Sequence, residues 1–395
     1  MRLTWYSNAP WAKSGYGIQT SQAVRRLAKA GHAVAIAANY GLQGTRIPDW
    51  QDGIPIFPSG KNRYSDDVTV GHHRIHRGDW LITLYDVWGL DPAFFKDARV
   101  ASWVPIDHQP VPPAVANWCR QHYSMAWSRF GMEELAKAGV DARYLPLAVE
   151  TQEYHPRDRL VSGRNVREVL GVPQDAFLVV VNAANKGNHP PRKGWGEMFL
   201  AFAIFAARHP DAYLYAHTDP FGQQGIDLPV LATGCNIPVD RLVWADEYAY
   251  LNGMIPEADL AAIYTSADVL LATSYAEGFG VPIIEAQACG TPVIVTDWTA
   301  MPELVGAGWV VPAQPMWDAP HASFLGMPFV GEIVRSLEDA YASKGDAAMG
   351  ERAIAFAQQY DADRVFAEHW QPVLRELESL LPQPPNRAER RRKRK

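Results

Sequence analysis

The sequence predicts an α/β protein with two open-sheet domains that face each other across a cleft. Short runs of β-forming residues alternate with amphipathic helical patterns along the whole chain, which favours open α/β sheets over a sandwich or a helix bundle. The length of 395 residues exceeds what one hydrophobic core normally organises. With 48% hydrophobic and 20% charged residues, disorder is excluded as a description of the whole chain.

The first domain is assigned to residues 1–150 and begins with a strand–helix–strand unit. We expect a strand at 3–7, a tight loop at 14–17, a helix at 18–30 and a strand at 33–38. Gly31 lies where a helix C-cap glycine belongs. Later strands are expected at 80–85, 100–106 and 143–147.

A polar segment from 150 to 167 separates the two halves, so residues 151–170 are assigned to an interdomain connection. The second domain, residues 171–360, restarts with a strand at 177–181 and a helix at 195–208. Its later elements are strands at 212–216, 242–244, 269–273 and 292–295 and a helix at 281–289. Ligands of such sheets bind beyond the carboxyl ends of the strands. The cleft between the two sheets is therefore the expected site.

The C-terminal part divides into a helix and a basic tail. Residues 361–381 carry apolar side chains at helical spacing, which predicts a helix that packs along a domain surface. Residues 382–395 hold seven of the 37 basic residues and one of the 43 acids, so the rest of the chain has a net charge of −12. Prolines and like-charge repulsion predict a disordered tail. It either solubilises the protein or contacts nucleic acid or anionic lipid.

The cysteines and the hydropathy pattern predict a cytoplasmic protein. Cys119, Cys235 and Cys289 are odd in number and lack metal-ligand spacing, which suits a reducing compartment. The apolar run at 199–207 is less than half of the roughly 20 residues that a membrane-spanning helix needs. The N-terminal sequence has no basic region followed by an apolar one. We expect neither secretion nor membrane insertion.

The segment from 274 to 296 is the strongest functional signal. It follows an expected buried strand, turns through Gly278 and Gly280, and enters a helix with Pro282 in its first turn, where the missing N–H has no cost. The backbone amides of Gly278, Phe279 and Gly280, with the helix dipole behind them, are expected to bind a phosphate.

Two glutamates flank this turn. Glu285 lies on an otherwise nearly apolar helix. Because an unpaired buried charge is very costly, its carboxylate must reach the helix edge or find buried donors such as ribose hydroxyls. Glu277, eight residues earlier on the loop, is expected to contact another part of the same ligand. The pattern therefore predicts one acid for a nucleoside and one for a sugar.

This segment resembles family 4 of the GT-B glycosyltransferases, whose hallmark is two glutamates separated by seven residues in a Glu-Gly-Phe-Gly context. Residues 14–17 lie where that family has a glycine-rich loop, in which Gly15 and Gly17 would let the first domain approach the donor closely. Residues 31–34 resemble its Gly-His-x-Val sequence, and 146–150 resemble the segment that closes its first domain. The resemblance covers nearly all of the chain except the basic tail. It implies two Rossmann-like domains, a nucleotide-sugar donor, retention of anomeric configuration, and no cofactor or divalent metal.

Basic side chains in 182–194 are expected to stabilise a diphosphate leaving group, because fixed cations can do this in place of Mg²⁺. Lys193 and the glycine after it match the lysine–glycine pair of the similar family. The arginine of that family would stand five residues earlier, where this chain has Asn188. The second cation is therefore Lys186 or Arg192, and a lengthened loop favours Lys186.

Four further candidates follow expected strands. His108 lies where the similar enzymes often contact the donor sugar, and Asp86 is a candidate to orient or deprotonate an acceptor hydroxyl. His217 is placed near the nucleotide, and Asp246 near its base.

The leading hypothesis is a cytoplasmic glycosyltransferase that uses a UDP- or GDP-linked sugar and an unidentified hydroxyl acceptor. In this hypothesis Glu277, Lys193, His108 and Asp86 act catalytically, and the other candidates bind the donor. Two alternatives stay open. One is an epimerase or phosphorylase of the same fold. The other is a DNA-associated protein recruited by the basic tail, which includes a glycosyltransferase of modified DNA bases, although the acidic body offers no basic face to a duplex.

Overall fold

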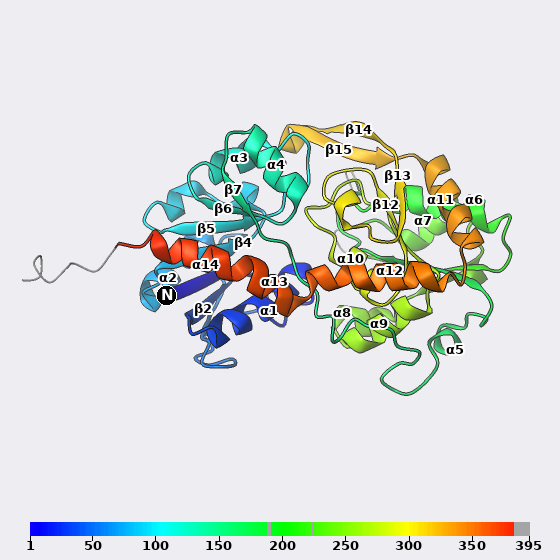
Figure 1. The fold of residues 1–395 in the computed structure, drawn as a ribbon, viewed down its shortest axis with the longest axis horizontal. Coiled ribbons are helices and arrows are strands. Elements are labelled where there is room, and N and C mark those ends of the chain that lie inside the picture. Colours follow the sequence, from blue (N-terminus) through cyan, green and yellow to red (C-terminus); the bar gives the residue numbers. More distant parts are fainter. Residues whose placement is uncertain (188–190, 223–224, 383–395) are drawn as a thin grey trace, which may run out of the picture.

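The computed structural model describes residues 1–187, 191–222 and 225–382 and contains two α/β domains side by side (Figure 1). Each domain is built on a parallel sheet with helices packed against it. The predicted fold class, two Rossmann-like domains, is therefore confirmed. Residues 383–395, nearly all of the predicted basic tail, lie outside the described residues. Within those described residues, no helix has the length and apolar character needed to cross a membrane.

The first domain has a seven-stranded sheet in the order β3-β2-β1-β4-β5-β6-β7. All neighbouring strands are parallel. Because the order runs outward from β1 on both sides, a crevice opens at the carboxyl ends of β1 and β4. The strands are β1 (Arg2–Ser7), β2 (Ala33–Ala38), β3 (Ile56–Phe57), β4 (Trp80–Leu84), β5 (Val100–Val104), β6 (Tyr123–Ala126) and β7 (Ala142–Tyr144).

The second domain repeats this plan with a six-stranded parallel sheet in the order β10-β9-β8-β11-β12-β13. Its strand order reverses between β8 and β11, which places a second crevice at their carboxyl ends. The strands are β8 (Phe177–Asn182), β9 (Ala212–His217), β10 (Leu242–Trp244), β11 (Val269–Ala272), β12 (Val293–Thr296) and β13 (Gly308–Val311).

The connections between strands supply the helices that cover the sheets. Those of the first domain are α1 (Gly15–Lys29), α2 (Asp66–His76), α3 (Pro113–Cys119) and α4 (Arg129–Lys137). The connecting segment and the second domain contain α5 (Val166–Leu170), α6 (Trp195–Ala206), α7 (Leu228–Gly234), α8 (Glu247–Leu251), α9 (Glu257–Ser266), α10 (Val281–Ala288), α11 (Val330–Ala342) and α12 (Ala347–Ala357).

The loop predicted at 14–17 is a helix start instead. Ser14 is the N-cap of α1, and its hydroxyl accepts a hydrogen bond from the backbone N–H of Gly17 at 3.1 Å. A Cβ on Gly17 would overlap the carbonyl oxygen of Ala12. Gly17 therefore allows close packing within the first domain, and its close approach to a donor stays a prediction. At Gly15 no atom lies near the Cβ position, so close approach of a donor to this residue stays the prediction.

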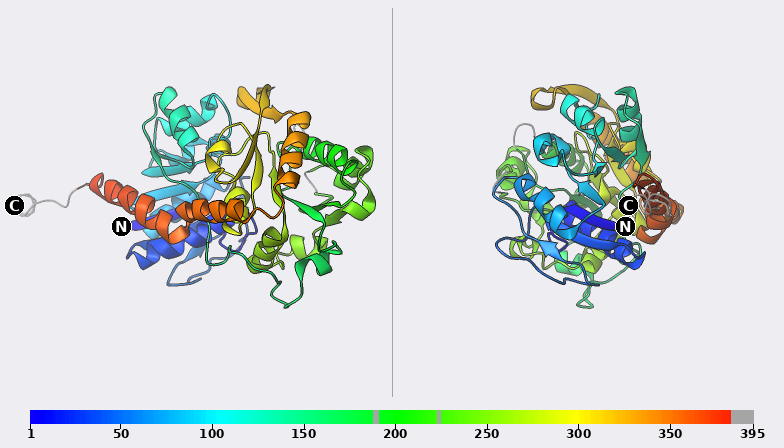
Figure 2. Two further views of the ribbon diagram at one scale, coloured as in Figure 1. Left: turned by 45° about the vertical axis from the view of Figure 1, so that its right-hand side comes forward. Right: turned by 90° about the vertical axis from the view of Figure 1, so that its left-hand side faces the viewer.

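The C-terminal helices return to the first domain (Figure 2). The helix predicted at 361–381 is continuous over residues 362–379 and consists of α13 (Ala362–Val365), a π-helical turn η7 (Phe366–Trp370) and α14 (Gln371–Ser379). The Trp370 ring packs against those of Trp5 and Trp103, with centroids 5.8 and 5.0 Å away. The indole of Trp80 donates to the carbonyl of Leu377 at 3.0 Å. The domain surface that this helix covers is therefore that of the first domain.

A β-hairpin that the sequence did not predict also links the two domains. It consists of β14 (Ala313–Asp318) and β15 (Ser323–Pro328), paired antiparallel after the last strand of the second sheet. Figure 1 shows the hairpin above the space between the domains. Gln109 of the first domain and Phe324 exchange two backbone hydrogen bonds of 3.2 Å. The hairpin therefore fastens the second domain to the loop after β5.

Candidate active site

A cavity of about 310 Å³ lies between the two domains, at the strand ends where each strand order reverses. The first domain lines it with Gly15, Tyr16, Gln19, Leu84, Asp86, Pro105, Asp107, Trp127 and Leu147. The second domain lines it with Asn182, Ala183, Arg192, Lys193, Met198, Ala272, Ser274, Glu277, Gly278, Phe279, Gly280, Val281, Pro282 and Ile283. The cleft expected from the alternation of strands and helices is therefore present.

Glu277 holds both cations of the loop that precedes α6. Its carboxylate accepts from the Lys193 ammonium at 2.5 Å and lies 3.3 Å from the Arg192 guanidinium. The backbone N–H of Glu277 donates to the Thr299 hydroxyl at 3.1 Å, which fixes the loop. Although burial opposes ionisation, Lys193 and Arg192 lower the pKa of Glu277 to about 2. The group is a carboxylate at neutral pH.

Lys193 and Arg192 place two cationic side chains on this side of the cavity. Burial lowers the pKa of Lys193, while Glu277 acts in the opposite direction. Burial also acts against the charge of Arg192, but Glu277, Asp107 and Asp86 together raise its pKa. A ligand phosphate that reaches these side chains can accept charge-assisted hydrogen bonds from both of them.

The predicted second cation, Lys186, is replaced by Arg192. Lys186 is exposed and does not line the cavity, whereas Arg192 lies between Glu277 and Asp107, 3.8 Å from the latter. Of the two candidates, the geometry therefore favours Arg192, because the loop places Arg192 and Lys193 side by side before α6. Asn188, on which that preference depended, lies outside the described residues.

The Glu-Gly-Phe-Gly turn approaches the first domain closely. A Cβ on Gly278 would overlap that of Pro105 and lie 2.9 Å from its Cα. Gly280 has φ of +112° as the N-cap of α10, and no side chain caps that helix. Gly278, Phe279 and Gly280 all line the cavity. The turn therefore presents a helix N-terminus to the cavity, as the phosphate-binding prediction requires.

Glu285 lies behind the cavity lining. It is only 4% exposed, in the second turn of α10, whereas the lining ends at Ile283. Its carboxylate accepts from the Tyr264 hydroxyl at 3.1 Å, and that hydroxyl accepts from the Asn182 amide at 2.6 Å. Asn182 does line the cavity. The prediction that Glu285 faces the cleft is thus not met in this conformation, and two hydrogen bonds connect it to the lining.

The first domain places two acids on the opposite wall. Asp86 follows β4 and accepts from the Tyr16 hydroxyl at 2.7 Å. Burial and the neighbouring Asp107 raise the pKa of Asp86. Burial opposes ionisation of Asp107 as well, but His108 and Arg192 hold its pKa well below the usual range. The wall therefore combines a firmly ionised carboxylate with one whose proton affinity is increased.

Three other predicted residues lie away from the cavity. His108 turns from it, because its two ring nitrogens bond Asp107 at 2.8 Å and Asp318 at 3.0 Å. His217 is buried against Tyr215, 3.0 Å from its hydroxyl, and burial lowers its pKa to about 4. Asp246 caps α8 by accepting from the N–H of Ala249 at 2.7 Å. None of these three side chains lines the cavity, and their contacts with a donor stay predictions.

Sequence reasoning missed several lining residues. Tyr16, Gln19 and Trp127 are polar or aromatic side chains that packing places in the cavity, and their type and spacing distinguish none of them from core residues. The indole N–H of Trp127 has no hydrogen-bond partner among the described residues. Asn182 ends β8, so its position at a strand end was the one available signal.

Comparisons with known proteins agree with this geometry. Residues 227–319 match the family model described as "Glycosyl transferases group 1". The chain is 27% identical over 260 residues to the D-inositol 3-phosphate glycosyltransferase of Arthrobacter sp. (strain FB24), which is 65% of this chain and 52% of that protein. It is 42% identical over 59 residues to the O-antigen chain mannosyltransferase B of Escherichia coli, which is 15% of this chain and 16% of that protein. The matches thus span about half of the first relative and a sixth of the second.

Solved structures resemble the whole fold. Sucrose-phosphate synthase from Thermosynechococcus elongatus superimposes with a TM-score of 0.73 at 17% identity, covering 96% of this chain and 100% of the other. Anabaena HepE in complex with UDP-glucose gives a TM-score of 0.69 at 17% identity, with 96% and 100% covered. At such identities the likeness establishes the fold, with both domains included.

Proposed function

We propose that this chain, a group 1 glycosyltransferase of the GT-B fold, transfers a sugar from a nucleotide-diphosphate donor to a hydroxyl acceptor. The observation that carries this proposal is the buried pair of cations, Lys193 and Arg192, held by Glu277 beside the N-terminus of α10. Such a set suits a diphosphate with a sugar attached. The HepE structure contains UDP-glucose, which supports a donor of this class.

In this proposal the diphosphate lies between the two cations and the backbone amides of residues 278–280. The cations neutralise the charge that develops as the bond from the anomeric carbon to the phosphate oxygen breaks, so no divalent ion is needed at that place. Glu277, kept ionised by its neighbours, accepts hydrogen bonds from sugar hydroxyls. Glu285 accepts from the ribose once the Tyr264 hydrogen bond is exchanged for one from the ligand.

The acceptor reacts from the first-domain side of the cavity, with retention of configuration. The acceptor oxygen forms the new bond to the anomeric carbon on the face that the phosphate leaves, and its proton passes to the departing phosphate oxygen. Asp86, held by Tyr16, orients the acceptor hydroxyl by accepting its hydrogen bond. Contact between the domains across the cavity keeps water from competing with the acceptor.

Donor binding tests the proposal directly. A panel of UDP- and GDP-linked sugars is screened for an increase in melting temperature, because a ligand that binds only the native state stabilises it. Lys193→Ala is expected to weaken binding of the best donor by at least about tenfold, since a hydrogen bond to a charged group contributes about 1.5–3 kcal/mol. Lys186→Ala is the matched control and should bind like the wild type.

Two outcomes would count against the proposal: no nucleotide sugar raises the melting temperature, or Lys186→Ala and Lys193→Ala lose affinity equally. Release of nucleoside diphosphate in the presence of an acceptor mixture then separates transfer from epimerisation, which alters the sugar and keeps the diphosphate bond. A phosphorylase would consume free phosphate in the same assay.

A further inference from the structure

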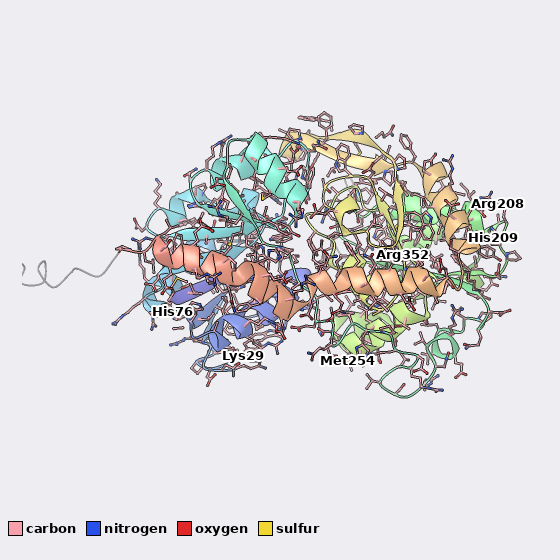
Figure 3. All side chains as sticks on the ribbon, in the orientation of Figure 1. Lys29, His76, Arg208, His209, Met254 and Arg352 are labelled. Carbon is pink, nitrogen blue, oxygen red and sulfur yellow. The ribbon has the colours of Figure 1, made fainter. Side chains whose placement is uncertain are left out.

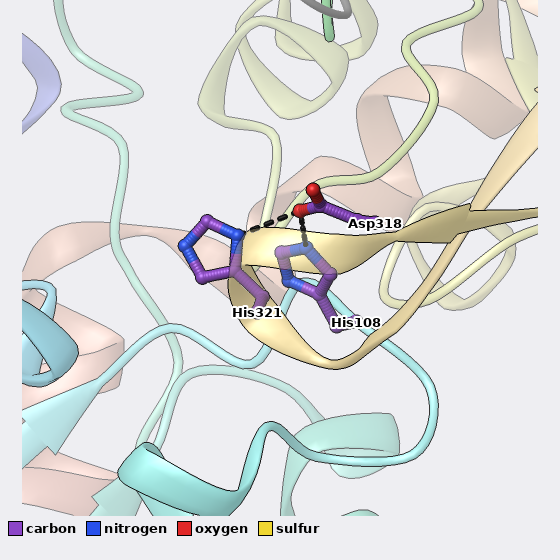
Figure 4. A group of neighbouring side chains, drawn as sticks. All are labelled: His108, Asp318 and His321. Carbon is purple, nitrogen blue, oxygen red and sulfur yellow. Dashed lines mark hydrogen bonds and ion pairs between the residues drawn. The ribbon is translucent and has the colours of Figure 1, made fainter.

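A group of three potential metal ligands joins the two domains outside the proposed donor site. His108 follows β5 in the first domain, whereas Asp318 and His321 belong to the hairpin segment of the second. Their ligand atoms all lie within 4.8 Å of one another, and no other group of three or more His, Cys, Asp or Glu side chains with this property occurs in the described ranges. Figure 4 shows the histidine rings on either side of the Asp318 carboxylate.

One oxygen of the Asp318 carboxylate is within hydrogen-bond distance of both histidine rings. Asp318 Oδ2 lies 3.0 Å from His108 Nε2 and 2.6 Å from His321 Nδ1. His108 and Asp318 are buried, and the His321 side chain is 24% exposed. The two histidine nitrogens therefore meet at one carboxylate oxygen, and His321 is the most exposed of the three side chains.

The surroundings of His108 favour a cation at this point. Its Nδ1 lies 2.8 Å from Asp107 Oδ1 and its Nε2 faces Asp318, so both ring nitrogens point at carboxylate oxygens. A neutral imidazole has one N–H and satisfies only one of the two. Both carboxylates are satisfied when a second positive species lies on the Asp318 side, either a proton on Nε2 or a metal ion bound to it.

This pairing of Asp107 with His108 is the arrangement that orients metal-ligating histidines. Such ligands commonly donate the second ring N–H to a carboxylate, which fixes the tautomer and increases the basicity of the ligating nitrogen. Two carboxylates contact the histidines directly: Asp107 and Asp318 both bond His108, and Asp318 also bonds His321. A divalent cation would offset their negative charge.

We propose that His108, Asp318 and His321 bind one divalent transition-metal ion, such as Zn²⁺, between the two domains. Two imidazoles and one carboxylate with a fourth position open to water are a common ligand set for zinc. Because the ligands come from both domains, the ion stabilises the arrangement in which the domains meet. It is separated from the diphosphate by Asp107, which also lies 3.8 Å from Arg192, so this inference is independent of the proposed donor chemistry.

The test uses the full chain, stripped with EDTA and dialysed into metal-free buffer. Zinc is then added, and the bound metal per chain is measured by plasma mass spectrometry together with the melting temperature. The expected result is one zinc ion per chain and a melting temperature that rises with zinc concentration. Co²⁺ substitution should give the intense visible absorption of a tetrahedral site with nitrogen and oxygen ligands.

Variants locate the site. His321→Gln and Asp318→Asn are expected to lose the bound zinc and the zinc-dependent rise in melting temperature. In EDTA their melting temperatures should differ from that of the wild type only by the effect of the hydrogen bonds that each substitution removes. Asp107→Asn, which removes the orienting carboxylate, should weaken zinc affinity about 10- to 100-fold. His209→Gln is the matched control, because His209 pairs with Glu338 at 2.8 Å and lies at the outer end of the second domain (Figure 3).

The proposal fails if the stripped wild type binds no zinc and no cobalt, since His108 is then held by a proton alone. It fails equally if His321→Gln and Asp318→Asn retain the ion with wild-type affinity, or if His209→Gln loses it to the same extent as they do.

Discussion

The substitution Glu285→Gln separates what this residue does for stability from what it does for binding. Glu285 is 4% exposed and accepts one hydrogen bond from Tyr264. Burial, with a smaller contribution from Glu257, raises the pKa of the carboxyl to about 7. Glutamine keeps the shape and an acceptor for the Tyr264 hydroxyl, but it carries no charge at any pH.

The sign of the pH effect follows from proton binding. Between the unfolded pKa of 4.5 and the folded value of about 7, the native state holds a proton that the unfolded chain releases, so the stability of the wild type falls as pH rises. Below pH 4.5 Glu285 is protonated in both states, so it does not change the pH dependence of stability. Above pH 7 it is ionised in both states, and its full destabilising effect on the native state is present. The pKa difference of about 2.5 between the folded and unfolded states corresponds to about 3 kcal/mol in the free energy of unfolding. Glu285→Gln is therefore expected to exceed the wild type in stability by up to about 3 kcal/mol at pH 8 and to match it near pH 4.5.

Urea unfolding of both proteins at pH 5 and pH 8, followed by circular dichroism, measures this difference. Glu351→Gln, exposed on α12, is the control and should leave the pH dependence unchanged. The same variant should bind a nucleotide-sugar donor more weakly than the wild type, because ribose hydroxyls donate better to a carboxylate than to an amide. The reasoning is refuted if Glu285→Gln and the wild type lose stability in parallel between pH 5 and pH 8, or if the variant is the less stable at pH 8.

Three further substitutions test other parts of the structure. Gly278→Ala places a methyl group against Pro105, so we expect a loss of donor-dependent turnover with an unchanged circular dichroism spectrum; full activity would show that the domains do not meet there. Trp370→Ala removes a ring packed between Trp5 and Trp103 and should lower unfolding stability by about 3–5 kcal/mol in thermal melts, whereas a loss below about 1 kcal/mol would mean that the helix return contributes little. Asp86→Asn should raise the KM for the acceptor while the affinity for the donor, measured by calorimetry, stays the same; equal losses of both would contradict an acceptor-side role.

Local sequence signals predicted the fold class and most of the donor-side loop. The strands are short and separated by helices, so hydrophobic periodicity locates them, and the turn at 278–280 combines glycines with a helix-start proline in one continuous segment. The interpretation of 14–17 as a loop overlooked a local signal, because Ser14 before a helical pattern is an N-cap residue. The hairpin was missed for a different reason. Its strands contain Pro315 and Pro328, and proline argues against a strand when only sequence is considered.

The contacts that complete the site join residues far apart in the sequence. His108 contacts Asp318, which is 210 positions away in the sequence, and Arg192 contacts Glu277, which is 85 positions away. Hydrophobic periodicity gives no information about pairs so far apart. The choice of Arg192 over Lys186 likewise depends on the path of a loop and not on spacing. Sequence reasoning therefore identified Lys193 and Glu277, which the structure places in the cavity, but it left the partner of each charge undetermined.

The relative position of the two domains is determined by segments that follow the glutamate motif. Glu303 on the 3₁₀ turn Pro302–Leu304 accepts two hydrogen bonds of 3.0 Å from the backbone N–H groups of Arg129 and Phe130 at the start of α4. The hairpin binds the loop after β5, and α14 binds the first sheet through Trp80. None of these segments lines the cavity, in which Asp86 and Asp107 of the first domain face Lys193 and Arg192 of the second. Opening and closing of the cavity must therefore change contacts made outside it, so substitutions in residues 302–377 can alter donor affinity without touching the donor.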